Sequence, residues 1–120
     1  MKAIHWITRL LSAEDDSAGE AALAIAGTHS AEGFQALRDS LNNAHDPWFR
    51  AVLLSAIALT RQDEALDFLL NLVRTESLDG ERAIEALMRS MPSENVIAEL
   101  EKLVASNSRL ARTYSALRKP

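Results

Sequence analysis

A regular spacing of leucines constrains this 120-residue chain more than any other feature. Four leucines follow one another at intervals of 31 residues: Leu10, Leu41, Leu72 and Leu103. Two further sets keep the interval, with Arg38 the one polar exception: Ala3, Phe34, Ala65 and Val96, and Ile7, Arg38, Leu69 and Leu100. Within each repeat the three positions stand at i, i+4 and i+7, which is one face of a helix. The spacing predicts four equivalent helices at about 2–12, 31–43, 62–75 and 93–106, with the four leucines buried at equivalent places.

A second helix is expected after each of these. Helix-start residues precede four further helical stretches: Asp16 with Ser17, Asp46 with Pro47, Asp79, and Asn107 with Ser108. Asp, Asn and Ser accept hydrogen bonds from the free amides of a first turn, and proline loses no bond at the first helical position. The second helices begin near residues 16, 47, 79 and 108. The chain therefore divides into four helix hairpins, in repeats at about 1–28, 29–60, 61–91 and 92–120.

The stretch that follows Pro47 indicates how the hairpins pack. In residues 48–60 only Arg50, Ser55 and Thr60 are polar. A helix that is apolar on nearly every side needs neighbours on at least two sides, as in the middle of a stack of hairpins. Few glycines and prolines and much Ala, Leu, Ser, Glu and Arg favour helix throughout. We expect a single all-α domain over residues 1–120, a right-handed α-solenoid of four antiparallel hairpins.

The segment DPWFRAVLLSA resembles the start of the second helix in HEAT repeats. The matching residues are Asp46, Pro47, Phe49, Arg50 and Ala51. LDGERAIEAL resembles the same pattern more loosely, whereas the first and fourth repeats depart from it. The interval of 31 residues is similar to that of the compact HEAT-like repeats of bacterial proteins, including those similar to phycobilisome lyases.

This resemblance implies an armadillo-like superhelix and a structural role for several residues. It implies that Arg50 bonds to acids such as Asp46 or Asp79 between neighbouring repeats, and that Pro47 starts a helix. A tetratricopeptide repeat is the main structural alternative, but its Trp, Leu-Gly and Tyr signature is absent from the sequence. An ordinary helical bundle would leave the interval between the leucines unexplained.

Composition and charge limit the partners. The chain has no cysteine and a formal net charge of −4. A basic segment without acids ends it, containing Arg109, Arg112, Arg118 and Lys119, so the first 106 residues hold 9 basic and 17 acidic side chains. Nucleic-acid binding is disfavoured because phosphate neutralisation needs clustered Lys and Arg. No apolar run has the length of a membrane span, and we expect a cytoplasmic protein.

No catalytic or metal-binding pattern stands out. His5, His29 and His45 are scattered, and a metal site needs three or four converging ligands. The spacing of Glu81, Glu85 and Arg89 suits surface pairs on a helix better than acid–base catalysis. We therefore expect neither an enzyme nor a cofactor nor a metal.

The remaining hypothesis is a binding module. A scaffold or adaptor would dock a protein or peptide on the concave face of the second helices, as a monomer or weak oligomer. The exposed candidates there are Glu20, Glu81, Glu85, Arg89 and Arg112. Two alternatives stay open. One is an accessory or lyase-like role, which the bacterial resemblance implies; the other is nucleic-acid binding like that of helical-repeat DNA glycosylases, which needs a basic concave stripe present here only at the C-terminal end.

Overall fold

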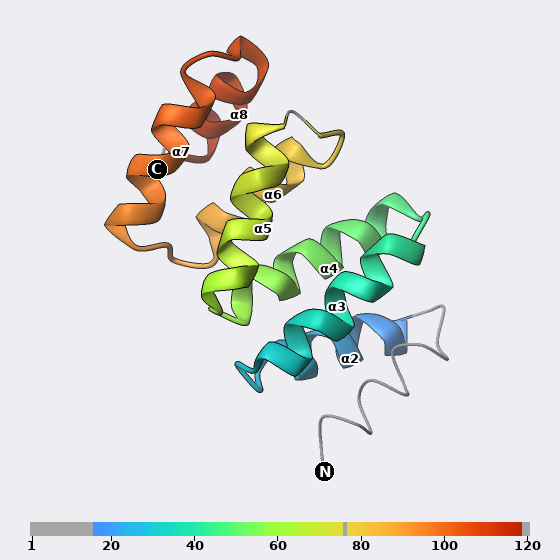
Figure 1. Cartoon of the computed structure of the whole chain (residues 1–120). Helices are drawn as coiled ribbons and strands as arrows, with labels where there is room; N and C mark the ends of the chain where they lie inside the picture. Colours follow the sequence, from blue (N-terminus) through green and yellow to red (C-terminus); the bar gives the residue numbers. More distant parts are fainter. Residues whose placement is uncertain (1–15, 76, 119–120) are drawn as a thin grey trace.

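The computed structural model describes residues 16–75 and 77–118, which are helical and contain no strand (Figure 1). Their helices are α2 (Asp16–Ala26), α3 (Ala31–Asn43), α4 (Pro47–Leu59), α5 (Asp63–Arg74), α6 (Gly80–Arg89), α7 (Glu94–Val104) and α8 (Ser108–Arg118). The expected all-α class is confirmed. The helix predicted at about 2–12, with Leu10, lies outside the described residues.

The predicted helix starts lie close to the observed ones. Helix α3 begins at the predicted residue, and α5, α6 and α7 each begin one residue later than predicted. The Asp46 carboxylate accepts a hydrogen bond from the amide of Phe49 at 2.9 Å, with Pro47 in the first turn. Asn107 Oδ1 accepts one from the amide of Leu110 at 3.1 Å. Capping side chains therefore start α4 and α8, because they satisfy amides that have no partner within the helix.

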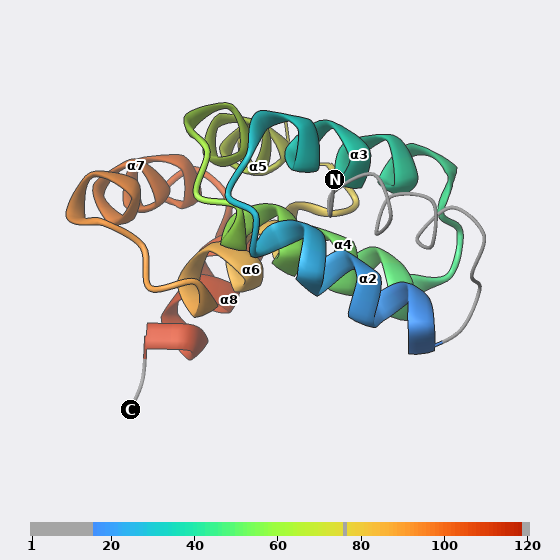
Figure 2. The same cartoon turned by 90° about the horizontal axis from the view of Figure 1, so that it is seen from below.

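The helices form two rows (Figure 2). One, called the A row, contains α3, α5 and α7; the other, called the B row, contains α2, α4, α6 and α8. Each A-row helix packs against the B-row helix that follows it, and successive B-row helices pack directly against one another. Helix α4 touches α2, α3, α5 and α6, which accounts for its apolar sequence. The largest fully buried side chains come from both rows: Ile25, Phe34, Leu37, Leu53, Leu54, Ile57, Leu69, Ile84, Leu87, Leu100, Leu110 and Val73.

Residues at the 31-residue interval lie on or beside the buried face of the A-row helices, but the leucines of the interval differ in how far they are buried. Phe34, Ala65 and Val96 are buried, as are Leu69 and Leu100, whereas Arg38 is exposed. The prediction that the repeated leucines are equally buried is wrong for two of them, because only Leu41 is buried while Leu72 and Leu103 are partly buried. The reason is the position of the buried stripe. In α5 it runs through residues 65, 69 and 73 and in α7 through 96, 100 and 104, and the two leucines lie beside it.

Every described turn from the B row to the A row has the same construction. A hydroxyl donates to the carbonyl three residues earlier: Thr28 to Ile25 at 2.7 Å, Thr60 to Ile57 at 2.7 Å and Ser90 to Leu87 at 2.8 Å. The next residue has a positive φ: 48° at His29, 57° at Arg61 and 58° at Met91. Left-handed residues after a helix end redirect the chain, a place where glycine is usual. The turns therefore repeat in conformation although their sequences differ.

Helix length also bears on membranes. Over residues 16–75 and 77–118, none of the helices combines the length and hydropathy needed to cross a bilayer.

Candidate functional site

Arg50 ties three parts of the chain together. Its Nη1 donates to the carbonyls of Leu41 and Ala44, at 2.8 and 2.7 Å, where α3 ends. Its Nη2 and Nε donate to the carboxylate of Asp79, just before α6. The Arg82 Nη1 lies 3.3 Å from the same carboxylate, whose side chain is 9% exposed. Nearly all the hydrogen-bonding capacity of Arg50 is therefore directed into the protein, between the end of α3 and the start of α6.

Asp79 corrects one expectation from the sequence. It occupies the position before α6, as predicted, but its side chain makes no capping hydrogen bond to that helix. Its two carboxylate oxygens face Arg50 and Arg82 instead. Charge-assisted hydrogen bonds to guanidinium groups are stronger than a bond to a neutral amide, so the ion pairs take precedence.

The surface side chains predicted to bind a partner come together only in part. The Nε of Arg109 in α8 lies 3.0 Å from Oε1 of Glu81 in α6, so this pair crosses between neighbouring helices. Within α6, Arg89 lies 2.9 Å from Glu85. Arg112 is exposed on α8, one turn beyond Arg109. These five residues form the charged half of the B-row surface.

Glu20 does not belong to that group. It is exposed on α2, and α4 lies between α2 and α6 in the row. Its neighbours at this end of the row are two exposed apolar side chains, Leu23 at 52% and Trp48 at 54%. The Trp48 ring packs over Gly19, where a Cβ atom would stand 3.4 Å from the ring. Leu23 and Trp48 form the apolar half of the B-row surface.

Sequence reasoning missed this apolar half. The composition of α4 predicts neighbours on most sides, so Trp48 reads as a core residue. The structure places it in the first turn of α4, where its side chain is 54% exposed. Its position directly after Pro47 was the signal available, because first-turn residues are less enclosed than those in mid-helix.

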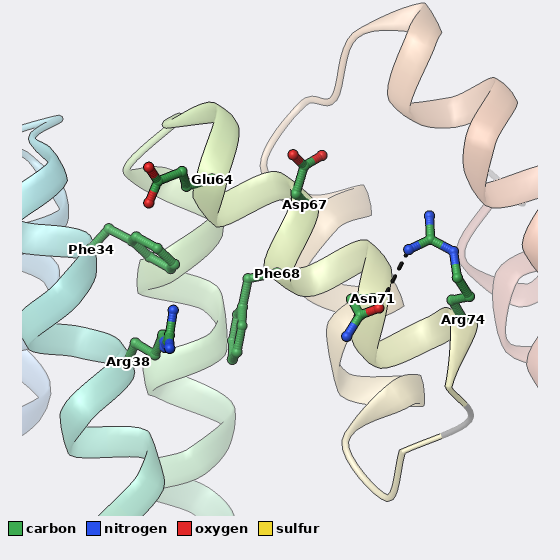
Figure 3. A pocket seen from close by; sticks show the side chains of 7 residues that line it. All are labelled: Phe34, Arg38, Glu64, Asp67, Phe68, Asn71 and Arg74. Atoms are coloured by element: carbon green, nitrogen blue, oxygen red, sulfur yellow. Dashed lines mark hydrogen bonds between the residues drawn. The ribbon is translucent and has the colours of Figure 1, made fainter.

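A second feature lies on the A row, where α3 and α5 enclose an open hollow (Figure 3). Its volume is about 610 Å³. Two aromatic rings and five polar side chains line it: Phe34, Arg38, Glu64, Asp67, Phe68, Asn71 and Arg74. None of them was a site candidate from the sequence, because their spacing on two separate helices carries no motif. Only the packing of α3 beside α5 brings them together.

The histidines and acids of the described chain do not gather into a metal site. Across residues 16–75 and 77–118, no group of three or more His, Asp or Glu side chains is placed to hold an ion. His29 follows α2 and His45 precedes α4, at separate turns, and His5 lies outside the described residues.

Comparison with known proteins adds no relative from which a site could be transferred. No family model matches the sequence, and no match was found among curated proteins or solved structures. The candidate surfaces therefore depend on the geometry of this chain alone.

Proposed function

We propose that the protein is a non-catalytic binding module of the HEAT-like helical-repeat kind that docks a protein or peptide on its B row. The observation that carries this proposal is the B-row surface itself. It combines a half-exposed tryptophan with charges of both signs on successive helices. Trp and Arg are enriched among the residues that dominate protein interfaces.

The arrangement of the rows supports a short solenoid with the B row inside the curve. Successive B-row helices all pack directly, and α5 packs against α7 on the A row, whereas α3 and α5 leave the hollow between them. Wider separation on the A side than on the B side bends a stack of hairpins toward the B row. Curved stacks of this kind offer extended concave surfaces for binding. Four hairpins, including one formed with the segment before α2, are part of this proposal.

A protein partner suits the charges better than nucleic acid. Of the basic side chains on α8, Arg109 is paired with Glu81, and Arg118 lies over the ring of Tyr114 at 5.8 Å. Arg112 is exposed and makes no such contact with the part of the chain that the structure describes. Duplex binding depends on several simultaneous phosphate contacts, which this helix does not offer without breaking its own pairs. We place the protein in the cytoplasm, as a monomer or weak oligomer.

Partner capture with a matched pair of triple variants tests the proposal. The first variant, Glu81→Ala, Glu85→Ala and Arg89→Ala, removes two acids and one base from the B row. The second, Glu94→Ala, Glu101→Ala and Lys102→Ala, removes the same charges from α7 in the A row. Immobilised protein is exposed to a lysate and the bound proteins are identified by mass spectrometry. We expect a partner held by the wild type and the A-row variant to be lost from the B-row variant, with helicity unchanged by circular dichroism.

A single substitution examines the apolar half of the surface. Trp48→Ala should weaken capture of the same partner, while Leu78→Ala, which truncates an exposed leucine before α6, should not. Retention of every captured protein by both B-row variants would contradict the proposal. Equal losses from the A-row and B-row triple variants would contradict it as well.

A further inference from the structure

The hollow between α3 and α5 lies on the A row, away from the B-row surface, and has its own charge pattern. We propose that it is a docking site for a short basic segment of another protein, in which an arginine or lysine stands next to an apolar side chain. This inference does not depend on the proposed function of the B row. It follows from the floor of the hollow, the carboxylates at its rim and the charge of the surrounding row.

The floor is aromatic and fixed. The rings of Phe34 and Phe68 meet edge to face, with centroids 6.0 Å apart and planes inclined at 63°. Phe34 is buried in the core, and Phe68 packs against the core while lining the hollow. Arg38 holds its guanidinium carbon 5.8 Å from the Phe68 centroid. An apolar side chain of a bound segment would therefore meet the part of Phe68 that Arg38 leaves open, on a surface that is already formed, which keeps the cost of binding low.

Two carboxylates at the rim have no cation of their own. Glu64 and Asp67 are exposed, and no hydrogen bond or ion pair reaches either carboxylate in the described part of the chain. Glu64 lies in the first turn of α5, where a helix favours acids. Asp67 lies beyond that turn, so helix stabilisation does not explain it. Like charges three residues apart repel each other on a helix, and a bound cation relieves that repulsion.

The basic residues of the hollow are already engaged. Arg38 covers the Phe68 ring, and Arg74 lies 3.6 Å from Glu99 and 3.4 Å from Asn71. Among the described residues, two carboxylates of the lining and one guanidinium, that of Arg38, have no ion-pair partner, so the unpaired charge is negative by one. Figure 3 shows Glu64 toward the Phe34 end of the hollow and Arg74 at the other end, with Asp67 between them and its carboxylate directed away from that of Glu64.

The surrounding A row has the same sign. Its three helices hold eight acidic side chains: Glu32, Asp39, Asp63, Glu64, Asp67, Glu94, Glu99 and Glu101. The bases there are Arg38, Arg74 and Lys102. This field attracts cationic segments and repels nucleic acid and acidic peptides.

The side chains that line the hollow also limit which kind of cationic ligand fits it. A quaternary ammonium prefers several open ring faces, whereas Arg38 already covers Phe68 here. An arginine side chain can instead donate two N–H groups to one rim carboxylate, because its guanidinium presents several donors in one plane. Helix α8 of a second copy is basic, but the exposed residues beside Arg112 include only small ones, Ser115 and Ala116, to meet the ring. A basic segment with a larger apolar side chain fits better.

The test uses ¹⁵N-labelled full-length protein and the capped peptide acetyl-Gly-Arg-Leu-Arg-Gly-amide, followed by NMR. We expect saturable shifts of the Asn71 side-chain amide and of the backbone amides of Glu64, Asp67 and Phe68. The indole of Trp48 on the B row should stay unshifted. The acidic peptide acetyl-Gly-Glu-Leu-Glu-Gly-amide should cause none of these changes. Equal shifts with both peptides, no saturable shift with the basic one, or shifts centred on Trp48 would overturn the proposal.

Matched variants separate local contacts from general attraction. Glu64→Gln with Asp67→Asn should weaken the basic peptide about tenfold, as expected when charge-assisted hydrogen bonds are lost. Glu94→Gln with Glu101→Gln removes the same charge from α7 and should leave affinity within about twofold, since distant sites act independently. Equal loss of peptide affinity in the two variants would mean that net charge alone attracts the peptide, and it would overturn the proposed site. The same resonances shifting with protein concentration alone would assign the hollow to a second copy and overturn the proposal.

Discussion

The two edges of the helix rows are held together in different ways. Where A-row helices lead into the B row, Arg50 reaches from α4 to the end of α3 and to Asp79, a long-range contact made once among the described turns of this edge. Where B-row helices lead back to the A row, each described turn has its own hydroxyl bond and its own left-handed residue. Among the described turns, one edge has an ionic cluster beside the caps of Asp46 and Asn107, and the other has a local device made three times.

This difference predicts unequal sensitivity to substitution. A single ionic cluster concentrates its stabilisation in a few atoms, so removal of one side chain leaves buried groups without partners. The repeated local device divides its stabilisation among three turns. Among the described residues, hydrogen bonds join the first two of them: His29 Nδ1 lies 3.3 Å from the carbonyl of Thr60, and Gln62 Nε2 donates to the carbonyl of His29 at 2.6 Å. Each change should therefore be small, and changes at the second and third turns should be independent.

The largest effect is expected for Arg50→Ala. The change leaves the carboxylate of Asp79 with Arg82 alone and the carbonyls of Leu41 and Ala44 without this donor. We expect the free energy of unfolding to fall by about 2–4 kcal/mol in urea titrations. Arg89→Ala, which breaks an exposed pair with Glu85, should cost less than about 1 kcal/mol.

The same variant also tests the role assigned to Arg50. If Arg50 is structural, Arg50→Ala leaves partner binding per folded molecule nearly unchanged. Loss of binding without loss of stability would instead make Arg50 part of a docking surface and would remove the contrast between the edges.

The next effect is expected at the other edge, for Thr60→Val. Thr60 is fully buried, and its hydroxyl donates to the carbonyl of Ile57 at 2.7 Å. Valine keeps the shape and loses the hydrogen bond, which should cost about 1 kcal/mol in the same titration. Thr113→Val removes a weaker, exposed bond to Arg109 in α8 and should change stability by less than about 0.5 kcal/mol. A loss at Thr60 as large as that at Arg50 would contradict the idea that this edge divides its stabilisation among several turns.

The sequence predicted the regular part of this architecture and missed what depends on packing between repeats. Helix starts near Pro47 and Ser108 could be located because capping is local chemistry. The left-handed turns escaped because His29, Arg61 and Met91 share a conformation and no side-chain type. Glycine at those positions would have been visible in the sequence.

The candidate binding surfaces were harder to predict from the sequence than the fold. Glu81, Glu85 and Arg89 could be assigned to one helix face from their spacing. The pairing of Glu81 with Arg109 could not be predicted, because it depends on how closely α8 lies beside α6. The hollow is harder still to predict from the sequence, because Phe34 and Phe68 meet only when α3 lies beside α5 in the folded chain.

Removal of a buried hydroxyl that has no hydrogen-bond partner should raise stability, whereas removal of the turn hydroxyls should lower it. Ser40 in α3 is buried, and its Oγ has no hydrogen bond in the described part of the chain. Removal of an unsatisfied polar group avoids its desolvation cost, so Ser40→Ala should raise the free energy of unfolding by about 1 kcal/mol. Urea titration of Ser40→Ala alongside Thr60→Val checks the expected gain and the expected loss of stability in one experiment. A loss of stability would mean that a bound water satisfies the hydroxyl.

The smallest expected effect addresses the left-handed residues themselves. Arg61 and Met91 are exposed, and a positive φ costs a residue with a side chain about 1–2 kcal/mol. Glycine removes that cost but loses about 0.5–1 kcal/mol in chain entropy. Arg61→Gly and Met91→Gly should therefore each raise stability by about 0.5 kcal/mol, additively in the double variant.

Leu78→Gly is the control at the other edge, because Leu78 is 95% exposed and lacks a positive φ. It should lower stability, and a gain there equal to that at Met91 would show that backbone conformation does not distinguish the two edges.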